Sequence, residues 1–164
     1  NEGTSLGVSF VLHSLGHLYA EQRQRWDEAY DVFEEALTYA ERAPVSLQAE
    51  QIGKILHSRA LLYIRDGKPD LALPDLTRSL KLWGHKPLHA AQVNRTIGIA
   101  YERMERYTTA IQYYERSFQE GLAARSKYHL RKIADTILKL LRSHGTPEEL
   151  KVWESKLRDY SSRT

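Results

Sequence analysis

The sequence contains no cysteine among its 164 residues. This absence excludes disulfide bonds, thiolate nucleophiles and cysteine metal sites together, and it leads us to expect a cytoplasmic protein. No apolar run approaches the roughly 18 residues that a membrane-spanning helix needs, so we expect no contact with a membrane. With five prolines and nine glycines, the chain also lacks the composition of a linker or a disordered tail.

The sequence motifs of common catalytic sites are missing as well. We find no glycine-rich phosphate loop, no GxGxxG and no GxSxG elbow. Carboxylate pairs such as Glu34-Glu35 and Glu148-Glu149 fall on expected helix surfaces or first helical turns, where they favour solvation and the helix dipole. We therefore expect a protein that is not an enzyme and that uses no cofactor.

The charge balance is only slightly basic. Lysine and arginine number 24 against 21 aspartates and glutamates, a net charge of +3. The cations mostly alternate with acids along the chain, as they do on solvated helix faces. A nucleic-acid-binding protein would gather them in one patch, so we expect no direct nucleic-acid binding by this chain.

A pattern of small and large residues occurs three times. A small residue is followed three positions later by tyrosine, and after nine or ten more residues by alanine. A large apolar residue and a second small residue follow that alanine at helical spacing. The three copies are Gly16, Tyr19, Ala29, Phe33 and Ala36; Ala60, Tyr63, Ala72, Leu76 and Ser79; and Gly98, Tyr101, Ala110, Tyr114 and Ser117. Such offsets let two helices cross closely, because the large side chain fills the space beside the small one.

This pattern resembles the tetratricopeptide repeat (TPR), whose signature has a leucine-glycine pair, a tyrosine three residues on, and alanine and phenylalanine in the second helix. Leu15-Gly16-x-x-Tyr19 is the best copy. The middle copy departs from the pattern, since Arg59 stands where leucine is expected and Leu76 where an aromatic residue is expected. The resemblance implies an all-α fold, a TPR-type α-solenoid of antiparallel helix pairs with about eight helices.

We expect a single TPR-like domain over residues 1–164. It would contain three repeats at about residues 5–44, 48–87 and 90–124, and a capping helix pair at about 126–160. Because the sequence has no initiator methionine, we also expect it to be a fragment of a longer protein.

The expected capping pair is marked by local signals. An apolar stripe of Leu130, Ile133, Ile137, Leu138 and Leu141 predicts a helix over about residues 126–142. The segment Thr146-Pro147-Glu148-Glu149 then reads as a capping box, with threonine as N-cap and glutamate three residues later. The last helix carries Leu150, Trp153, Leu157 and Tyr160 at helical spacing.

In the TPR family, the first helix of each pair lines a concave groove, and the resemblance carries those positions onto this sequence. The predicted peptide-binding groove consists of His13, His17, Lys54, His57, Leu61, Arg65, Arg95, Ile99, Arg103, Tyr128 and Arg131. The same helices would also present Phe10, Glu21, Gln92, Glu102, Asp135 and Leu138.

Cations outnumber acids in this set, and a concave wall of one sign attracts the opposite charge. Arginine can also hold a carboxylate through two parallel hydrogen bonds. These properties predict a groove for an acidic peptide or a free C-terminal carboxylate. The alternative is that the arginines pair with neighbours such as Glu102 and Asp135 and form no ligand site.

His13 and His17 lie four residues apart, with Glu21 a further four on. Two histidines at this spacing can hold zinc, but the sequence has no HExxH motif and offers no evident further ligand. We expect these residues to face the groove and to bind no metal.

The chain is therefore predicted to be a protein- or peptide-binding module. In architecture and repeat length it is also similar to the sensor half of bacterial transcriptional regulators that join a helix-turn-helix domain to a TPR array, some of which sense short peptides. The alternative is a passive scaffold without a peptide ligand, which would form a homodimer through exposed apolar residues around Trp153 and Tyr160.

Overall fold

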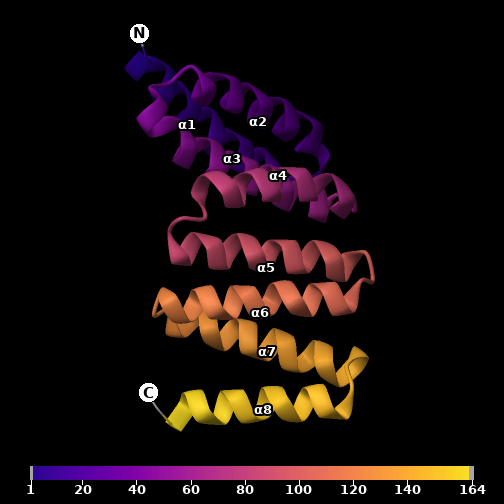
Figure 1. Ribbon diagram of the computed structural model, residues 1–164. Helices are drawn as coiled ribbons and strands as arrows, with labels where there is room; N and C mark the ends of the chain where they lie inside the picture. Colours follow the sequence, from indigo (N-terminus) through magenta and orange to yellow (C-terminus); the bar gives the residue numbers. More distant parts are fainter. Residues whose placement is uncertain (1, 163–164) are drawn as a thin grey trace. The chain divides into compact units, whose positions relative to one another are not determined.

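The computed structural model describes residues 2–162. Within them the chain forms eight α-helices, one short 3-10 turn and no strand (Figure 1). The predicted all-α fold with about eight helices in TPR-type pairs is confirmed. The chain divides into two compact units, with the boundary between His85 and Lys86.

The first unit consists of two helix pairs. Its elements are α1 (Glu2–Ala20), the 3-10 turn η1 (Arg23–Arg25), α2 (Trp26–Glu41), α3 (Val45–Arg65) and α4 (Pro69–Trp83). Helix α3 packs against α1 and α2 as well as against its own partner α4, so the two pairs are joined within the unit. The buried side chains of Phe33, Ile55 and Leu56 lie in the core that results.

The second unit also consists of two helix pairs. Its elements are α5 (Pro87–Arg103), α6 (Tyr107–Ala123), α7 (Lys127–His144) and α8 (Pro147–Ser162), and each helix packs against the next. Tyr114, Phe118 and Trp153 bring α6 and α8 into one core with the buried residues of α7.

The small residues of the repeat lie where the large ones need space. A side chain added at Gly16 would place its Cβ atom 2.6 Å from Cε1 of Phe33, which leaves no room for it. The same holds at Gly98, whose Cβ atom would lie 2.6 Å from Cε1 of Tyr114. The predicted interlocking of small and large residues is therefore confirmed in the first and third repeats.

Serine at the second small position adds a hydrogen bond between the helices of a pair. The hydroxyl of Ser79 in α4 donates to the carbonyl oxygen of Gly53 in α3 at 2.7 Å, and that of Ser117 in α6 donates to the carbonyl of Ala91 in α5 at 2.7 Å. All four residues are buried. A small side chain is required for close approach, and its hydroxyl is satisfied because a backbone carbonyl lies opposite.

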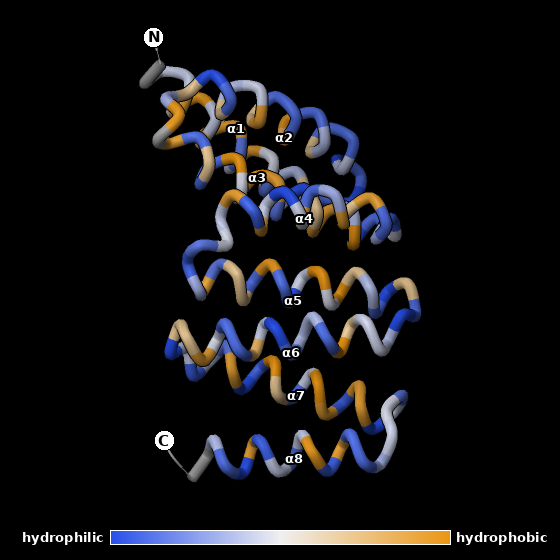
Figure 2. Tube along the Cα trace, in the orientation of Figure 1, coloured by the Kyte–Doolittle hydropathy of each residue, from blue (hydrophilic) through white to orange (hydrophobic). Residues whose placement is uncertain are grey.

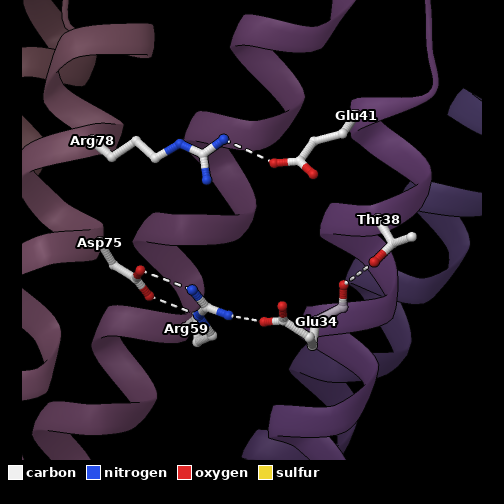
Figure 3. A network of polar contacts seen from close by, with 6 residues as sticks. All are labelled: Glu34, Thr38, Glu41, Arg59, Asp75 and Arg78. Atoms are coloured by element: carbon white, nitrogen blue, oxygen red, sulfur yellow. Dashed lines mark hydrogen bonds and ion pairs between the residues drawn. The ribbon is translucent and has the colours of Figure 1, made fainter.

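Arg59, the departure from the family pattern, joins three helices (Figure 3). Its guanidinium donates two hydrogen bonds to the carboxylate of Asp75 in α4, from Nε at 2.7 Å and from Nη2 at 2.9 Å. A third bond runs to Glu34 in α2. Since Asp75 is only 8% exposed, its charge needs this partner, and an ion pair here replaces the apolar contact of the usual leucine.

The sequence signals at the C-terminal end are also confirmed. Of the predicted stripe in α7, Leu130, Ile133, Ile137 and Leu141 are buried. The stripe is visible as orange segments on an otherwise polar helix (Figure 2). The capping box is formed as well: Thr146 N donates to a carboxylate oxygen of Glu149 at 2.8 Å, and Glu149 N donates to the threonine hydroxyl at 3.2 Å.

Candidate functional site

The predicted groove residues all lie on the first helix of a pair, and they divide between the two units. Helices α1 and α3 of the first unit carry His13, His17, Lys54, His57, Leu61 and Arg65. Helices α5 and α7 of the second unit carry Arg95, Ile99, Arg103, Tyr128 and Arg131. Each unit therefore has a candidate surface of its own, which we call the α1/α3 face and the α5/α7 face.

On the α1/α3 face, two histidines meet one serine. His13 Nε2 and His17 Nε2 each lie 2.9 Å from Oγ of Ser58. Their rings are 4.8 Å apart, and both lie close to the ring of Phe33. The sequence pattern placed the histidines on one face, but it did not reveal Ser58, because this contact spans more than 40 residues.

Both histidines are electrically neutral at pH 7. Burial, together with the nearby His17 and Lys54, lowers the pKa of His13 to about 4, and burial contributes most. Burial also lowers the pKa of His17, with Arg65 acting in the same direction and Glu21 against it. Removing a cation from water and placing it beside other cations both disfavour the charged form. These two side chains therefore add no positive charge to this face at pH 7.

The remaining cations of the α1/α3 face are paired with acids. Lys54 Nζ lies 2.7 Å from a carboxylate oxygen of Glu50, and Arg65 Nη1 lies 3.3 Å from one of Glu21. His57 lies beside the ring of Trp83. Lys54 and Arg65 therefore follow the alternative prediction, in which cations pair with neighbouring acids.

The α5/α7 face is different, because within residues 2–162 its arginines have no acidic partner. Arg95 is half-buried, Arg103 and Arg131 are exposed, and none of the three forms an ion pair within residues 2–162. The carboxylate of Glu102 accepts a hydrogen bond from the Tyr114 hydroxyl at 2.6 Å and forms no ion pair within residues 2–162. Three guanidinium groups are thus available to a ligand on this unit.

One cavity opens beside Arg131 and another beside Arg103. Arg131 and Asp135 line one of about 270 Å³ together with Leu157 and Tyr160 of α8. A second, of about 390 Å³, lies between α5 and α7. Its lining includes Arg103, Glu102, Tyr107, Lys139 and His144.

The apolar residues predicted for this face have two different roles. Tyr128 is 79% exposed and is free to contact a ligand, whereas Ile99 is half-buried and packs against the core of the unit.

Sequence reasoning missed His129, which lies behind the α5/α7 face. It is buried, and its Nε2 atom lies 2.9 Å from the Ser117 hydroxyl. Burial lowers the pKa of His129, and the charge of Arg95 acts in the same direction. Nothing in the local pattern marks this residue, since its partners come from α5 and α6.

The apolar patch predicted around Trp153 is absent, and that expectation is wrong. Trp153 is only 3% exposed. Its indole packs edge-on against Phe118, and its Nε1 atom donates to Glu115 at 2.6 Å. Tyr160 is half-buried against the same phenylalanine. The periodicity placed both on one face of α8, but that face is turned toward α6 and α7.

Among residues 2–162, no three histidine, aspartate or glutamate side chains are grouped so that they could hold a metal ion. In the same part of the chain, no helix combines the length and apolar character that spanning a membrane requires.

Sequence profiles of a known protein family match these helix pairs. Two sequence profiles, both described as tetratricopeptide repeat, match residues 11–44 and 51–119, together more than half of the chain. A comparison with curated proteins gave no match. TPR domains bind protein partners, so the chain is a protein–protein interaction module. On the repeat pattern, the helix pairs and both profiles, the chain belongs to the tetratricopeptide repeat family.

Proposed function

We propose that this interaction module binds an acidic peptide segment, or the free C-terminal carboxylate of a partner, on its α5/α7 face. The role is one of binding without catalysis. Recognition would come from Arg95, Arg103 and Arg131, with Tyr128 supplying an exposed apolar contact. Arginine suits this task because its planar group can grip a carboxylate through two hydrogen bonds.

The observation that carries the proposal is that these three arginines have no carboxylate partner in the described chain. The α1/α3 face provides an internal contrast, since Lys54 and Arg65 are paired with Glu50 and Glu21. Unpaired cations beside cavities attract anions without first breaking an internal bond.

Fluorescence anisotropy with synthetic peptides tests the proposal. Labelled eight-residue peptides rich in aspartate and glutamate, with a free or an amidated C-terminus, are titrated with the whole chain. We expect the variant Arg95→Ala/Arg131→Ala to bind at least about tenfold more weakly, since each hydrogen bond between charged groups contributes about 1.5–3 kcal/mol. A preference for the free C-terminus would identify the terminal carboxylate as the ligand.

A matched control removes two cations elsewhere on the same unit. The variant Lys151→Ala/Arg158→Ala changes exposed residues of α8 and should keep wild-type affinity. Arg95→Lys/Arg131→Lys should bind weakly although its charge is unchanged, because lysine lacks the two-pronged geometry. Equal loss of affinity in the control variant would show that binding depends only on the net charge of the chain, and it would contradict a specific site.

The further role, as the ligand-responsive part of a bacterial transcriptional regulator in the cytoplasm, is a proposal supported by the long repeats. Helices α1 and α3 have 19 and 21 residues. The test is whether the native protein binds DNA fragments in a gel-shift assay, and whether adding the acidic peptide changes its affinity for them. A protein that binds no DNA, or whose DNA binding ignores the peptide, would contradict this role and leave peptide binding unaffected.

A further inference from the structure

The second unit has a groove between its two outer helices, α6 and α8, on which no predicted ligand residue lies. One cavity of about 390 Å³ lies between their N-terminal ends. A second cavity of about 510 Å³ continues it along the helices and shares Gln112, Glu115 and Trp153 with the first. A third, which shares Gln119 and Lys156 with the second, reaches Tyr160. We call this continuous depression the α6/α8 groove.

The floor of the groove at its N-terminal end is apolar. Ile111 of α6, Leu141 of α7 and Val152 and Trp153 of α8 line it. Val152 is 53% exposed, so an apolar side chain of a partner can bury it. Trp153 is held in place by its hydrogen bond to Glu115 and by the edge of Phe118. A floor that is already ordered costs a ligand little entropy on binding.

The walls at the same end are acidic. Glu115, Glu148 and Glu149 line the cavity, and no lysine or arginine does. The hydrogen bonds that Glu115 and Glu149 accept come from neutral donors, the Trp153 indole and a backbone amide. None of the three carboxylates forms an ion pair within residues 2–162. Their charge is therefore available to a cation from outside.

In the first unit, the carboxylate at the position equivalent to Glu115 is neutralised by an arginine of the same unit. Glu34 follows the large residue of its repeat, as Glu115 does, and Arg59 of the next helix pairs with it (Figure 3). Arg59 stands directly before the small residue Ala60. The corresponding residue before Ala134 in α7 is Ile133, which is buried and carries no charge. In the second unit, the helix that follows thus supplies no guanidinium for Glu115.

We propose that the α6/α8 groove is a second docking site, whose ligand is a segment of a partner protein with an arginine or lysine beside an apolar side chain. The apolar side chain would cover Val152 and the accessible part of Ile111. The cation would lie between Glu115 in the middle of α6 and Glu148 and Glu149 in the first turn of α8. Complementary charge sets which partner is chosen and its orientation, while burial of apolar area provides affinity.

This site is separate from the α5/α7 face and has the opposite charge. A module with an arginine-bearing face and an acidic groove can hold two chemically different segments at once. The second site does not depend on the acidic-peptide proposal, because none of the three arginines that would bind the acidic peptide lines the α6/α8 groove.

The test uses the whole chain and two defined peptides, followed by NMR. The probe is an acetylated and amidated eight-residue peptide with two leucines between two arginines, and the control peptide has glutamate in place of arginine. We expect the arginine peptide to shift the Trp153 indole signal and the methyl signals of Ile111 and Val152. The glutamate peptide should leave these signals unchanged.

The key variant is Glu115→Gln/Glu148→Gln. Glutamine at position 115 keeps an oxygen for the Trp153 indole, so the variant removes charge and preserves shape. We expect the arginine peptide to bind roughly three- to tenfold more weakly. The matched control, Glu35→Gln/Glu154→Gln, removes the same charge from exposed or partly exposed positions that do not line the groove, and should bind as the wild type does.

Three outcomes would overturn the inference. They are no binding of the arginine peptide at millimolar concentration, shifts confined to the α5/α7 face, and affinity unchanged in Glu115→Gln/Glu148→Gln. The variant Arg95→Ala/Arg131→Ala should keep full affinity for the arginine peptide, which distinguishes failure of this site from failure of the acidic-peptide site.

Discussion

The ring of Tyr114 fills the space that a side chain at position 98 would need, and its hydroxyl donates to Glu102 at 2.6 Å. One residue thus has two roles. Its ring lets α5 and α6 cross closely at Gly98, and its hydroxyl binds the acid nearest to Arg103 in sequence. Packing of the repeat and the position of the Glu102 carboxylate are connected through this tyrosine.

Substitution of Gly98 by alanine should lower the free energy of unfolding by about 1–3 kcal/mol, because the added methyl group overlaps the Tyr114 ring and forces a shift. Urea unfolding followed by circular dichroism measures this. Gly7→Ala is the control: position 7 lies in α1, and a methyl group added there would have nothing within 4 Å, so stability should rise by about 0.5–1 kcal/mol. In a Tyr114→Leu background, the cost of Gly98→Ala should shrink, since the middle repeat combines Ala60 with Leu76. An undiminished cost would show that the ring is not the cause.

Replacing Arg59 with the leucine that the family pattern favours should destabilise the chain by about 2–4 kcal/mol, because Asp75 would remain buried without a partner. Thermal and urea unfolding measure the loss. The double variant Arg59→Leu/Asp75→Leu should recover most of it. Arg78→Ala, which breaks a half-exposed pair with Glu41, should cost less than about 1 kcal/mol. A large effect of Arg78→Ala, or no recovery in the double variant, would contradict this account of the network in Figure 3.

Three helices end in the same turn, with one residue in the left-handed region. Gly67 after α3 has φ +74°, and its place is taken by Glu105 (φ 59°) after α5 and Arg125 (φ 52°) after α6. In each turn the next amide donates back to the carbonyl five residues earlier. Glu105→Gly should therefore raise the free energy of unfolding by roughly 1 kcal/mol, and Gly67→Ala should lower it by a similar amount. Differential scanning calorimetry measures both. A lower melting temperature for Glu105→Gly would mean that its side chain contributes more than the strain costs.

Stability should fall as the pH is lowered from about 6.5 toward 4, in part because of His13. Its pKa is lowered to about 4 in the folded chain, so in this range the unfolded chain binds a proton that the folded chain does not. The contribution is fully present above pH 6.5 and is lost as the pH falls. We expect the melting temperature of His13→Gln to change less between pH 7 and 5.5 than that of the wild type, and His85→Gln, which alters an exposed histidine, is the matched control. Equal pH dependence in His13→Gln and the wild type would rule out this role.

Much of the fold could be predicted because its causes are local or periodic. The small-large pattern of Gly16 with Phe33 and Gly98 with Tyr114 sets how closely two neighbouring helices approach, and that pattern is visible in the sequence. The capping box at Thr146 and Glu149 involves residues three positions apart. The stripe in α7 follows from helical periodicity alone.

The candidate site could be predicted only as a set of positions on the first helix of each pair. Whether Arg65 or Arg131 is available to a ligand depends on which acid lies within reach, and that acid can come from any helix nearby. Trp153 illustrates the same limit, since helical spacing gave its face on α8 but not what covers that face. Ser58 beside the two histidines and Glu115 beside Trp153 are likewise contacts between distant residues.

The sequence by itself determined that this chain is a set of TPR helix pairs, because close crossing, capping and amphipathic faces depend on residues a few positions apart. Only the tertiary structure decided where charge remains unpaired: on the arginines of the α5/α7 face and on the glutamates of the α6/α8 groove. The physical reason is that a side chain's charge is neutralised by whatever lies within a few ångströms in space, and in a stack of helices those neighbours come from other helices.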